Sequence, residues 1–278
     1  MEKHNKKGRE DLVRKYFITP PKKPGYFGNY LFMVIAAGIM AYPFLMPYSD
    51  PDTRKIVLVF GIVIFIITLA RYFTKKNRYK AAYNKAEPKA SDEQMDIWLN
   101  EGKEMILKTA RERLDIDHDD ISRDPLMIDG PPASEKYSMR PGKDKILRFK
   151  THDIFLIFLT KHNIAIFQCI YNLEFDEILE DKTKEFPYKD ITNLETETST
   201  DTFYYQNDNK TKIEGIKSFS LFTSGSNKIS INYFFIKNIT DTDGYTFPPS
   251  DDENTIKAIR KRLKEYKDQI SEGQQNNN

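Results

Sequence analysis

The strongest constraint on the fold is a pair of long apolar runs on either side of the polar stretch "MPYSDPDTRK". The first run, Pro24–Ser49, has no charged side chain in 26 residues, and the second, Ile56–Ala70, has none in 15. A membrane-spanning helix needs about 20 mostly apolar residues, and Lys55 and Arg71 can lengthen the second run by reaching towards the lipid headgroups. Both runs are apolar at nearly every position, whereas a surface helix of a soluble protein is apolar along one stripe. The pattern therefore favours two membrane-spanning helices over a buried hairpin in a soluble core.

So short a connection predicts an antiparallel hairpin over residues 26–73, with spans at about 28–48 and 55–73 and an outer turn at 49–54. Residues 1–23 contain eight Lys/Arg and residues 71–85 contain six with no acidic residue, while the stretch "MPYSDPDTRK" contains two. By the positive-inside rule, both chain ends lie in the cytoplasm of a multi-pass protein of the inner (plasma) membrane. The apolar run exceeds a normal signal core and no small-x-small cleavage site follows it, which argues against a cleaved signal peptide.

Aromatic rings and long basic side chains gather at the edges of the predicted hairpin, where such residues anchor helices in the membrane interface. We expect six residues to act as anchors: Tyr26, Tyr30, Tyr48, Lys55, Arg71 and Tyr72. Residues 1–25 form a basic cytoplasmic arm in which Leu12, Val13, Tyr16 and Phe17 share one helical face. Two interpretations of this arm stay open, a short interfacial helix or a disordered segment.

The charge is divided unevenly along the chain. Residues 1–85 carry 16 Lys/Arg and 5 Asp/Glu, a net charge of +11, whereas residues 86–278 carry 27 and 36, a net charge of −9. The basic part suits the surface of an anionic membrane, and the acidic part argues against nucleic acid as a partner. The single cysteine, Cys169, excludes an internal disulfide framework, in keeping with a cytoplasmic location. Small residues between Ala36 and Ala41 permit close helix packing, either within the hairpin or in a homo-oligomer.

The pattern after the hairpin changes from helical to alternating. A basic linker over residues 74–90 leads to an amphipathic helix over 91–115, where Ser91 and Gln94 form a capping-box pattern. Residues 116–144 are rich in Pro and Gly and predict an irregular segment. From residue 145 on, short runs rich in Ile, Phe and Tyr alternate with polar turns, which indicates an antiparallel meander. A second amphipathic helix ends near residue 270, and residues 271–278 form a disordered tail.

Over about residues 145–270, this order resembles the bacterial pleckstrin-homology-like (PH-like) domains. The resemblance rests on "FLTKHNIAIF", a strand, tight turn and strand, then on "FPYKDITNLE", two further strands and a C-terminal helix. It implies a bent antiparallel sheet that a C-terminal helix caps at one end. The expected fold class is therefore α+β: a two-helix transmembrane hairpin followed by a cytoplasmic antiparallel β domain. The family includes protein-binding members, and the fold alone does not give the function.

Motifs for catalysis or metal binding are weak. The cluster "LDIDHDDISRD" places Asp115, Asp117, Asp119 and Asp120 around a histidine, but it lacks the glycine and the final carboxylate of a calcium loop. His152 and His162 flank one predicted strand, near opposite ends, and are expected to lie apart. The chain has no Gly-rich phosphate loop, zinc spacing or nucleophile elbow. We therefore expect no catalytic residue, no metal and no cofactor.

The expected function is that of a non-catalytic, membrane-anchored scaffold or assembly subunit that binds membrane lipids and other proteins, for example within a secretion or envelope complex. The docking surfaces are expected at an open sheet edge and on the helix that carries Trp98, Leu99 and Ile106. One alternative is a lipid-headgroup sensor. The resemblance implies that its basic residues are those of the first strands: Lys143, Lys145, Arg148 and Lys150. The second alternative is a membrane-bound enzyme.

Overall fold

The computed structural model describes residues 2–45, 50–132, 138–204, 210–224, 228–240, 246, 248 and 252–275. The chain forms two compact units. One contains Met1–Phe17 together with Ala90–Asn278, and the other contains Ile18–Lys89. The residues on both sides of the apolar hairpin thus belong to the same unit.

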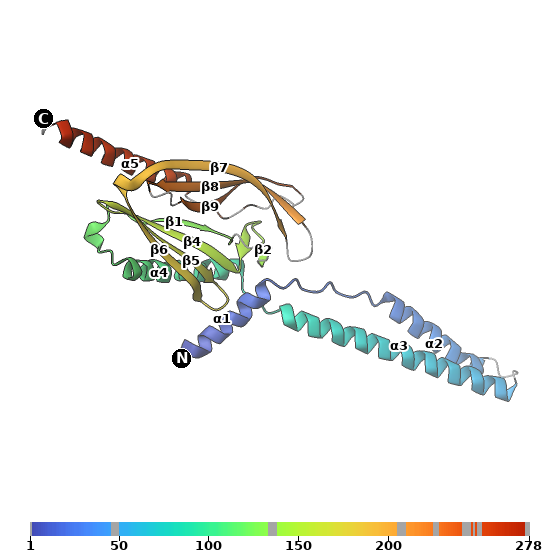
Figure 1. Ribbon diagram of the computed structural model, residues 1–278. Coiled ribbons are helices and arrows are strands. Elements are labelled where there is room, and N and C mark those ends of the chain that lie inside the picture. The colour runs from blue at the N-terminus through green and yellow to red at the C-terminus, as the bar shows by residue number, and fades with distance from the viewer. Residues whose placement is uncertain are drawn as a thin grey trace. The chain divides into compact units, whose positions relative to one another are not determined.

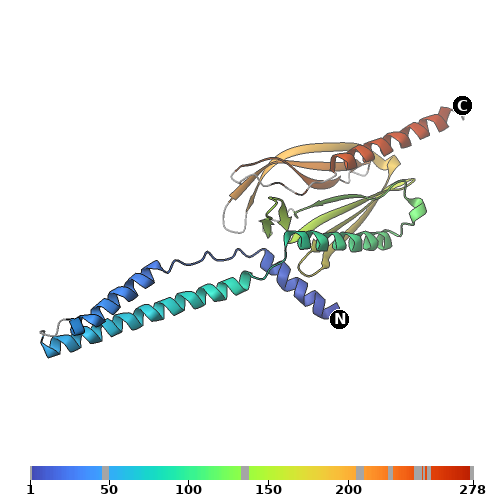
Figure 2. The ribbon, with the colours of Figure 1, turned by 180° about the vertical axis from the view of Figure 1, so that it is seen from behind.

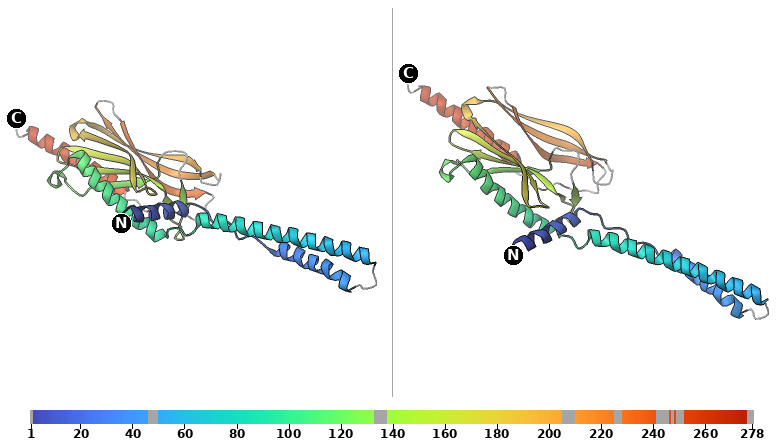
Figure 3. Two further views of the ribbon diagram at one scale, coloured as in Figure 1. Left: turned by 90° about the horizontal axis from the view of Figure 1, so that it is seen from below. Right: turned by 60° about the horizontal axis from the view of Figure 1, so that its bottom comes forward.

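The smaller unit is a hairpin of two helices that lie side by side, α2 (Phe27–Leu45) and α3 (Pro51–Ala86) (Figure 3). Asp50 caps α3 by accepting hydrogen bonds from the backbone N–H groups of Asp52 and Thr53. Both helices are long and apolar enough to cross a membrane, and only 6% and 11% of their most apolar windows are buried. A core helix of a soluble protein would bury most of these residues, so water is an unfavourable surrounding for them.

Helix α3 is longer than its predicted span. Its 36 residues correspond to about 54 Å of helix, of which about 24 Å follows Ala70, the end of the apolar run. The predicted basic linker is therefore helical up to Ala86. The physical reason is that residues 71–86 contain neither Gly nor Pro and consist largely of good helix formers. Pro88 lies just beyond this end.

The described residues of the larger unit form two antiparallel sheets and a short ribbon (Figure 1). The first sheet has the order β1-β4-β5-β6: β1 (Leu126–Gly130), β4 (Thr151–Leu159), β5 (Asn163–Asn172) and β6 (Glu177–Pro187). The second sheet has the order β7-β8-β9: β7 (Ile191–Tyr204), β8 (Lys210–Thr223) and β9 (Lys228–Thr240). The ribbon pairs β2 (Met139–Pro141) with β3 (Leu147–Phe149), and the last element is α5 (Asp252–Gln275).

The central strands β4 and β5 are buried on both faces, which explains their nearly continuous apolar sequences. On one face, Phe155 and Ile166 pack in a cluster with residues of the second sheet and with Ile259 of α5. On the other face, Leu156 and Phe167 pack in a second cluster that includes helix α4 (Asp92–Leu114) (Figure 2). The unit is therefore layered, with α4 on one side of the first sheet and the second sheet with α5 on the other.

The basic arm forms helix α1 (Glu2–Tyr16), a helix being one of the two interpretations left open for it. Elsewhere the structure differs from the sequence-based prediction: β1 and β2 lie inside the segment predicted to be irregular, and α5 extends to Gln275 through part of the predicted tail. The two short strands contain few residues with a periodic pattern, so tertiary contacts decide their structure. Val13 and Tyr16 of α1 are buried, as is Ile128 of β1.

Candidate functional site

Trp98, on the surface of α4 that was expected to bind a partner, contacts α1 of the same chain. Arg9 lies above the Trp98 ring, 5.4 Å from its centroid, and donates a 3.3 Å hydrogen bond to the Trp98 carbonyl. Leu99 is partly buried against the adjoining cluster, and Ile106 is fully buried. The described structure therefore leaves little of this predicted surface open to another protein.

Polar contacts hold α1 in place. The Arg9 guanidinium, only 10% exposed, forms an ion pair of 3.0 Å with Asp176 and donates a 3.1 Å hydrogen bond to the Tyr171 hydroxyl. The Tyr16 hydroxyl donates to Asp92 at 2.7 Å, and burial together with this carboxylate raises the pKa of Tyr16. These contacts join the chain before the hairpin to the chain after it.

The basic residues of the predicted lipid-headgroup site do not converge on an open surface. Arg148 is 7% exposed, and its guanidinium donates to Asp96 at 2.7 Å and to Asp144 at 2.8 Å. The hydrogen bond from Arg148 lowers the pKa of Asp144 to about 2. Lys150 pairs with Glu174 at 3.0 Å.

The remaining two basic residues of that set, Lys143 and Lys145, lie in a turn. The backbone N–H of Lys143 donates to Asp92 at 2.8 Å, and Lys145 has a positive φ of 66°. Two of the four cations, Arg148 and Lys150, are thus paired with carboxylates of their own unit. Arg148 ties β3 to α4, and Lys150 ties the start of β4 to Glu174, just after β5.

His152 belongs to a buried network next to a cavity of about 190 Å³ between α4 and the ribbon. Its Nδ1 lies 2.8 Å from Asp129, and its Nε2 lies 3.2 Å from the Phe149 carbonyl oxygen. Burial alone would raise the pKa of Asp129, but His152 and Lys103 lower it to about 2. Both ring nitrogens thus lie within hydrogen-bond distance of an oxygen atom of the same unit. His162 lies in the turn between β4 and β5, where its carbonyl accepts from the N–H of Tyr188.

The acidic cluster acts as a helix end within the part of the chain that the structure describes. Asp115 is the left-handed C-cap of α4, with φ 48°, and Asp117 precedes a short 3₁₀ turn that contains Asp119 and Asp120. The described residues contain no group of three or more His, Cys, Asp or Glu side chains that could hold a metal ion.

The predicted interface anchors lie at the two ends of the hairpin. The rings of Tyr26 and Tyr30 lie 5.1 and 6.0 Å from that of Tyr72. At the opposite end, Lys55 pairs with Asp52 at 3.2 Å. Arg71 lines an open groove between α2 and α3, and Tyr48 lies outside the described residues.

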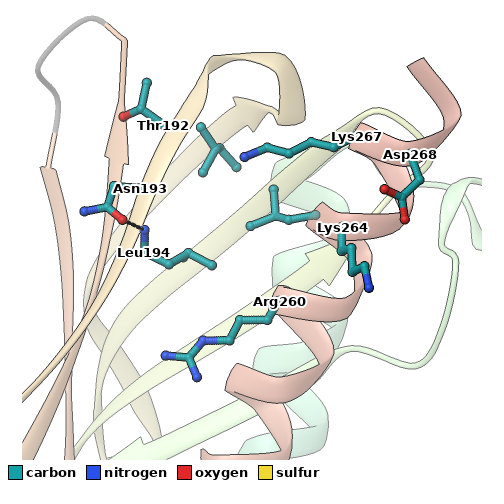
Figure 4. A pocket seen from close by; sticks show the side chains of 9 residues that line it. Thr192, Asn193, Leu194, Arg260, Lys264, Lys267 and Asp268 are labelled. Carbon is teal, nitrogen blue, oxygen red and sulfur yellow. Dashed lines mark hydrogen bonds between the residues drawn. The ribbon is translucent and has the colours of Figure 1, made fainter. Parts of the chain in front are cut away.

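An open basic groove of the larger unit lies between the start of β7 and α5. It has a volume of about 400 Å³. The first residues of β7 line it, together with exposed polar residues of α5 and the buried Leu263: Ile191, Thr192, Asn193, Leu194, Arg260, Leu263, Lys264, Lys267 and Asp268. Figure 4 shows Arg260 and Lys267 extending from the helix towards the strand side of the groove. Three of the four charged residues that line it are cations.

The strand at this groove is an edge. Among the described strands, β7 pairs only with β8, whereas β6 and β1 are the two edges of the other sheet. Six of the eleven residues of β6 are charged, a composition that discourages strand addition. The first four residues of β7, Ile191–Leu194, carry no charge. The sequence analysis predicted an open sheet edge but could not identify the strand. The charge of a strand bears on strand addition only once the pairing of the strands shows which of them are edges.

Comparisons of the chain with protein-family models, with curated proteins and with solved structures find no match.

Proposed function

We propose that the chain is a non-catalytic, membrane-anchored interaction module. Its helical hairpin spans the membrane, and its cytoplasmic β unit binds an extended acidic segment of a partner protein in the groove between β7 and α5. The observation that carries the proposal is the uncharged edge of β7 beside Arg260, Lys264 and Lys267.

The chemistry of the groove supports this choice of partner. An extended peptide can add to an open sheet edge through main-chain hydrogen bonds, while side chains beside the edge give specificity. Here three cations lie beside that edge, so carboxylates of the added segment would be attracted. Membrane anchoring is supported by the exposed apolar surfaces of α2 and α3. The inclusion of residues on both sides of the hairpin in one unit supports the placement of both ends on the same side, because one folded unit lies on one side of a membrane. The Lys/Arg excess at those ends favours the cytoplasmic side.

We retain the PH-like resemblance as part of the proposal. The resemblance implies one bent antiparallel sheet with a C-terminal helix at one end, and the described residues form a four-stranded and a three-stranded antiparallel sheet. What supports the resemblance is the C-terminal helix, which packs in one cluster with both sheets. The ligand is argued from the groove alone, because a fold of this kind serves several functions. The basic strand around Arg148 is not proposed as a lipid sensor, since Arg148 and Lys150 already pair with carboxylates.

The groove predicts a position-specific crosslink. A photoreactive amino acid at Thr192 of the full-length chain in native cells should form a discrete adduct with a partner protein. The same amino acid at Thr183 of the charged edge strand β6 should not. The double variant Lys264→Glu/Lys267→Glu should reduce the Thr192 adduct about tenfold, because it reverses two charges beside the bound segment.

The matched control is Lys257→Glu/Lys261→Glu, which makes the same charge change on the same helix outside the groove. It should change the Thr192 adduct by less than about twofold, since exposed charges farther away are screened. Equal adducts from Thr183 and Thr192, or equal losses in the two double variants, would contradict binding in the groove.

A further inference from the structure

A second groove lies within the hairpin unit, between the first turn of α2 and the middle of α3. It is open, has a volume of about 600 Å³, and is lined by Asn29 of α2. The residues of α3 that line it include Ile67, Arg71, Thr74 and Arg78, which recur at spacings of three and four residues and so share one helical face. None of these residues belongs to the β unit, so this groove is independent of the one between β7 and α5.

The groove changes character along α3. Ile67 and Ala70, the last residues of the apolar run, form its first part, and Arg71, Lys75 and Arg78 form the part that follows over the next two turns. A molecule that fills both parts needs an apolar portion and an anionic portion, in that order from the membrane core outwards. A phospholipid with an anionic headgroup has this chemistry.

The cations that line the groove have N–H donors available for a ligand. Arg71 and Arg78 form no ion pair among the described residues, and residues 71–86 contain no acidic residue. Lys75 gives one of its three N–H donors to the Gly25 carbonyl at 2.8 Å, which ties the chain before α2 to the groove. By contrast, Lys76 lies over the Tyr72 ring, 5.9 Å from its centroid, and does not line the groove.

We propose that this groove binds the headgroup of an anionic phospholipid from the cytoplasmic leaflet. Arg71, Lys75 and Arg78 contact its phosphate, and Ile67 and Ala70 contact the start of an acyl chain. Basic pockets between membrane helices on the cytoplasmic side are suited to such headgroups. The inference rests on the proposed insertion of α2 and α3 in a membrane.

The test uses the full-length chain in detergent micelles and measures the binding of phosphatidylglycerol by native mass spectrometry, with phosphatidylcholine as the zwitterionic reference. The variant Arg71→Gln/Lys75→Gln/Arg78→Gln should raise the apparent Kd for phosphatidylglycerol about tenfold or more, because three phosphate contacts are removed. The control Lys76→Gln/Lys80→Gln/Lys85→Gln removes the same charge from the same helix outside the groove, and it should raise the Kd less than about twofold. Neither variant should change phosphatidylcholine binding.

Three results would overturn the site. They are equal weakening by the two triple variants, no preference of the wild-type chain for phosphatidylglycerol, and displacement of the lipid by millimolar inorganic phosphate, which would indicate a free-anion site. Alkaline carbonate extraction of native membranes distinguishes failure of the lipid site from failure of membrane insertion. A wild-type chain that stays in the membrane but shows no lipid preference refutes only the lipid site. A chain released by carbonate refutes the insertion on which the site depends.

Discussion

Replacing Gly102 by leucine is expected to separate α4 from the first sheet and to lower the free energy of unfolding by about 3 kcal/mol or more. A Cβ atom at Gly102 would overlap the Tyr171 ring, with 2.7 Å to its Cε1. Tyr171 is fully buried, and its hydroxyl is fixed by Arg9 and Asp176, so the ring has no room to move away. Leucine is a better helix former than glycine, so a loss of stability would report packing and not helix propensity.

The measurement is chemical unfolding of the full-length chain in detergent micelles, followed by the fluorescence of Trp98, the single tryptophan. The control is Gly8→Ala in α1, where a Cβ atom would meet nothing within 4 Å. This control should leave stability unchanged or raise it by up to about 1 kcal/mol. Equal stability of the wild-type chain and Gly102→Leu would show that α4 does not pack against Tyr171 as described.

The variant Arg9→Met should release α1 and lower the free energy of unfolding by about 3 kcal/mol. It removes the buried partner of Asp176 and of the Tyr171 hydroxyl, as well as the cation above Trp98. The emission of Trp98 should shift to longer wavelength before the main unfolding transition, because one side of the ring becomes exposed to water.

Arg14→Met is the matched control for this change. Arg14 lies on the same helix, is 54% exposed and pairs only with Asp11 among the described residues. Its loss should change stability by less than about 0.5 kcal/mol and leave the Trp98 emission in place. An unchanged spectrum in Arg9→Met would contradict the contact between α1 and α4.

The regular patterns of the sequence predicted most of the elements. The two apolar runs predicted α2 and α3, the stripe from Met95 to Leu114 predicted α4, and the alternation after residue 145 predicted antiparallel strands. These patterns are local, because the spacing of apolar residues within each element is enough to recognise it. The N-cap hydrogen bond from the Gln94 N–H to Ser91 is local as well.

Contacts between distant residues could not be predicted in this way. Arg9 meets Asp176 and Arg148 meets Asp96, pairs that only the fold brings together. The same holds for β1, a five-residue strand whose assignment depends on its pairing with β4. Both proposed grooves combine residues of two elements, so the basic residues that line them are visible in the sequence but their convergence is not.

The central claim is that α2 and α3 cross a membrane and that both ends of the chain remain on its cytoplasmic side. Single cysteines test this claim when placed at exposed positions of three elements: Asp52→Cys at the turn of the hairpin, Arg14→Cys on α1 and Lys261→Cys on α5. The native Cys169 gives little background, because it is buried and burial raises the pKa of its thiol to about 12.

Intact cells are treated with a membrane-impermeant maleimide, and membranes opened by detergent serve as the reference. The account predicts that Asp52→Cys is modified in intact cells, whereas Arg14→Cys and Lys261→Cys are modified only after the membrane is opened. Modification of either Arg14→Cys or Lys261→Cys in intact cells, or protection of Asp52→Cys, would contradict it.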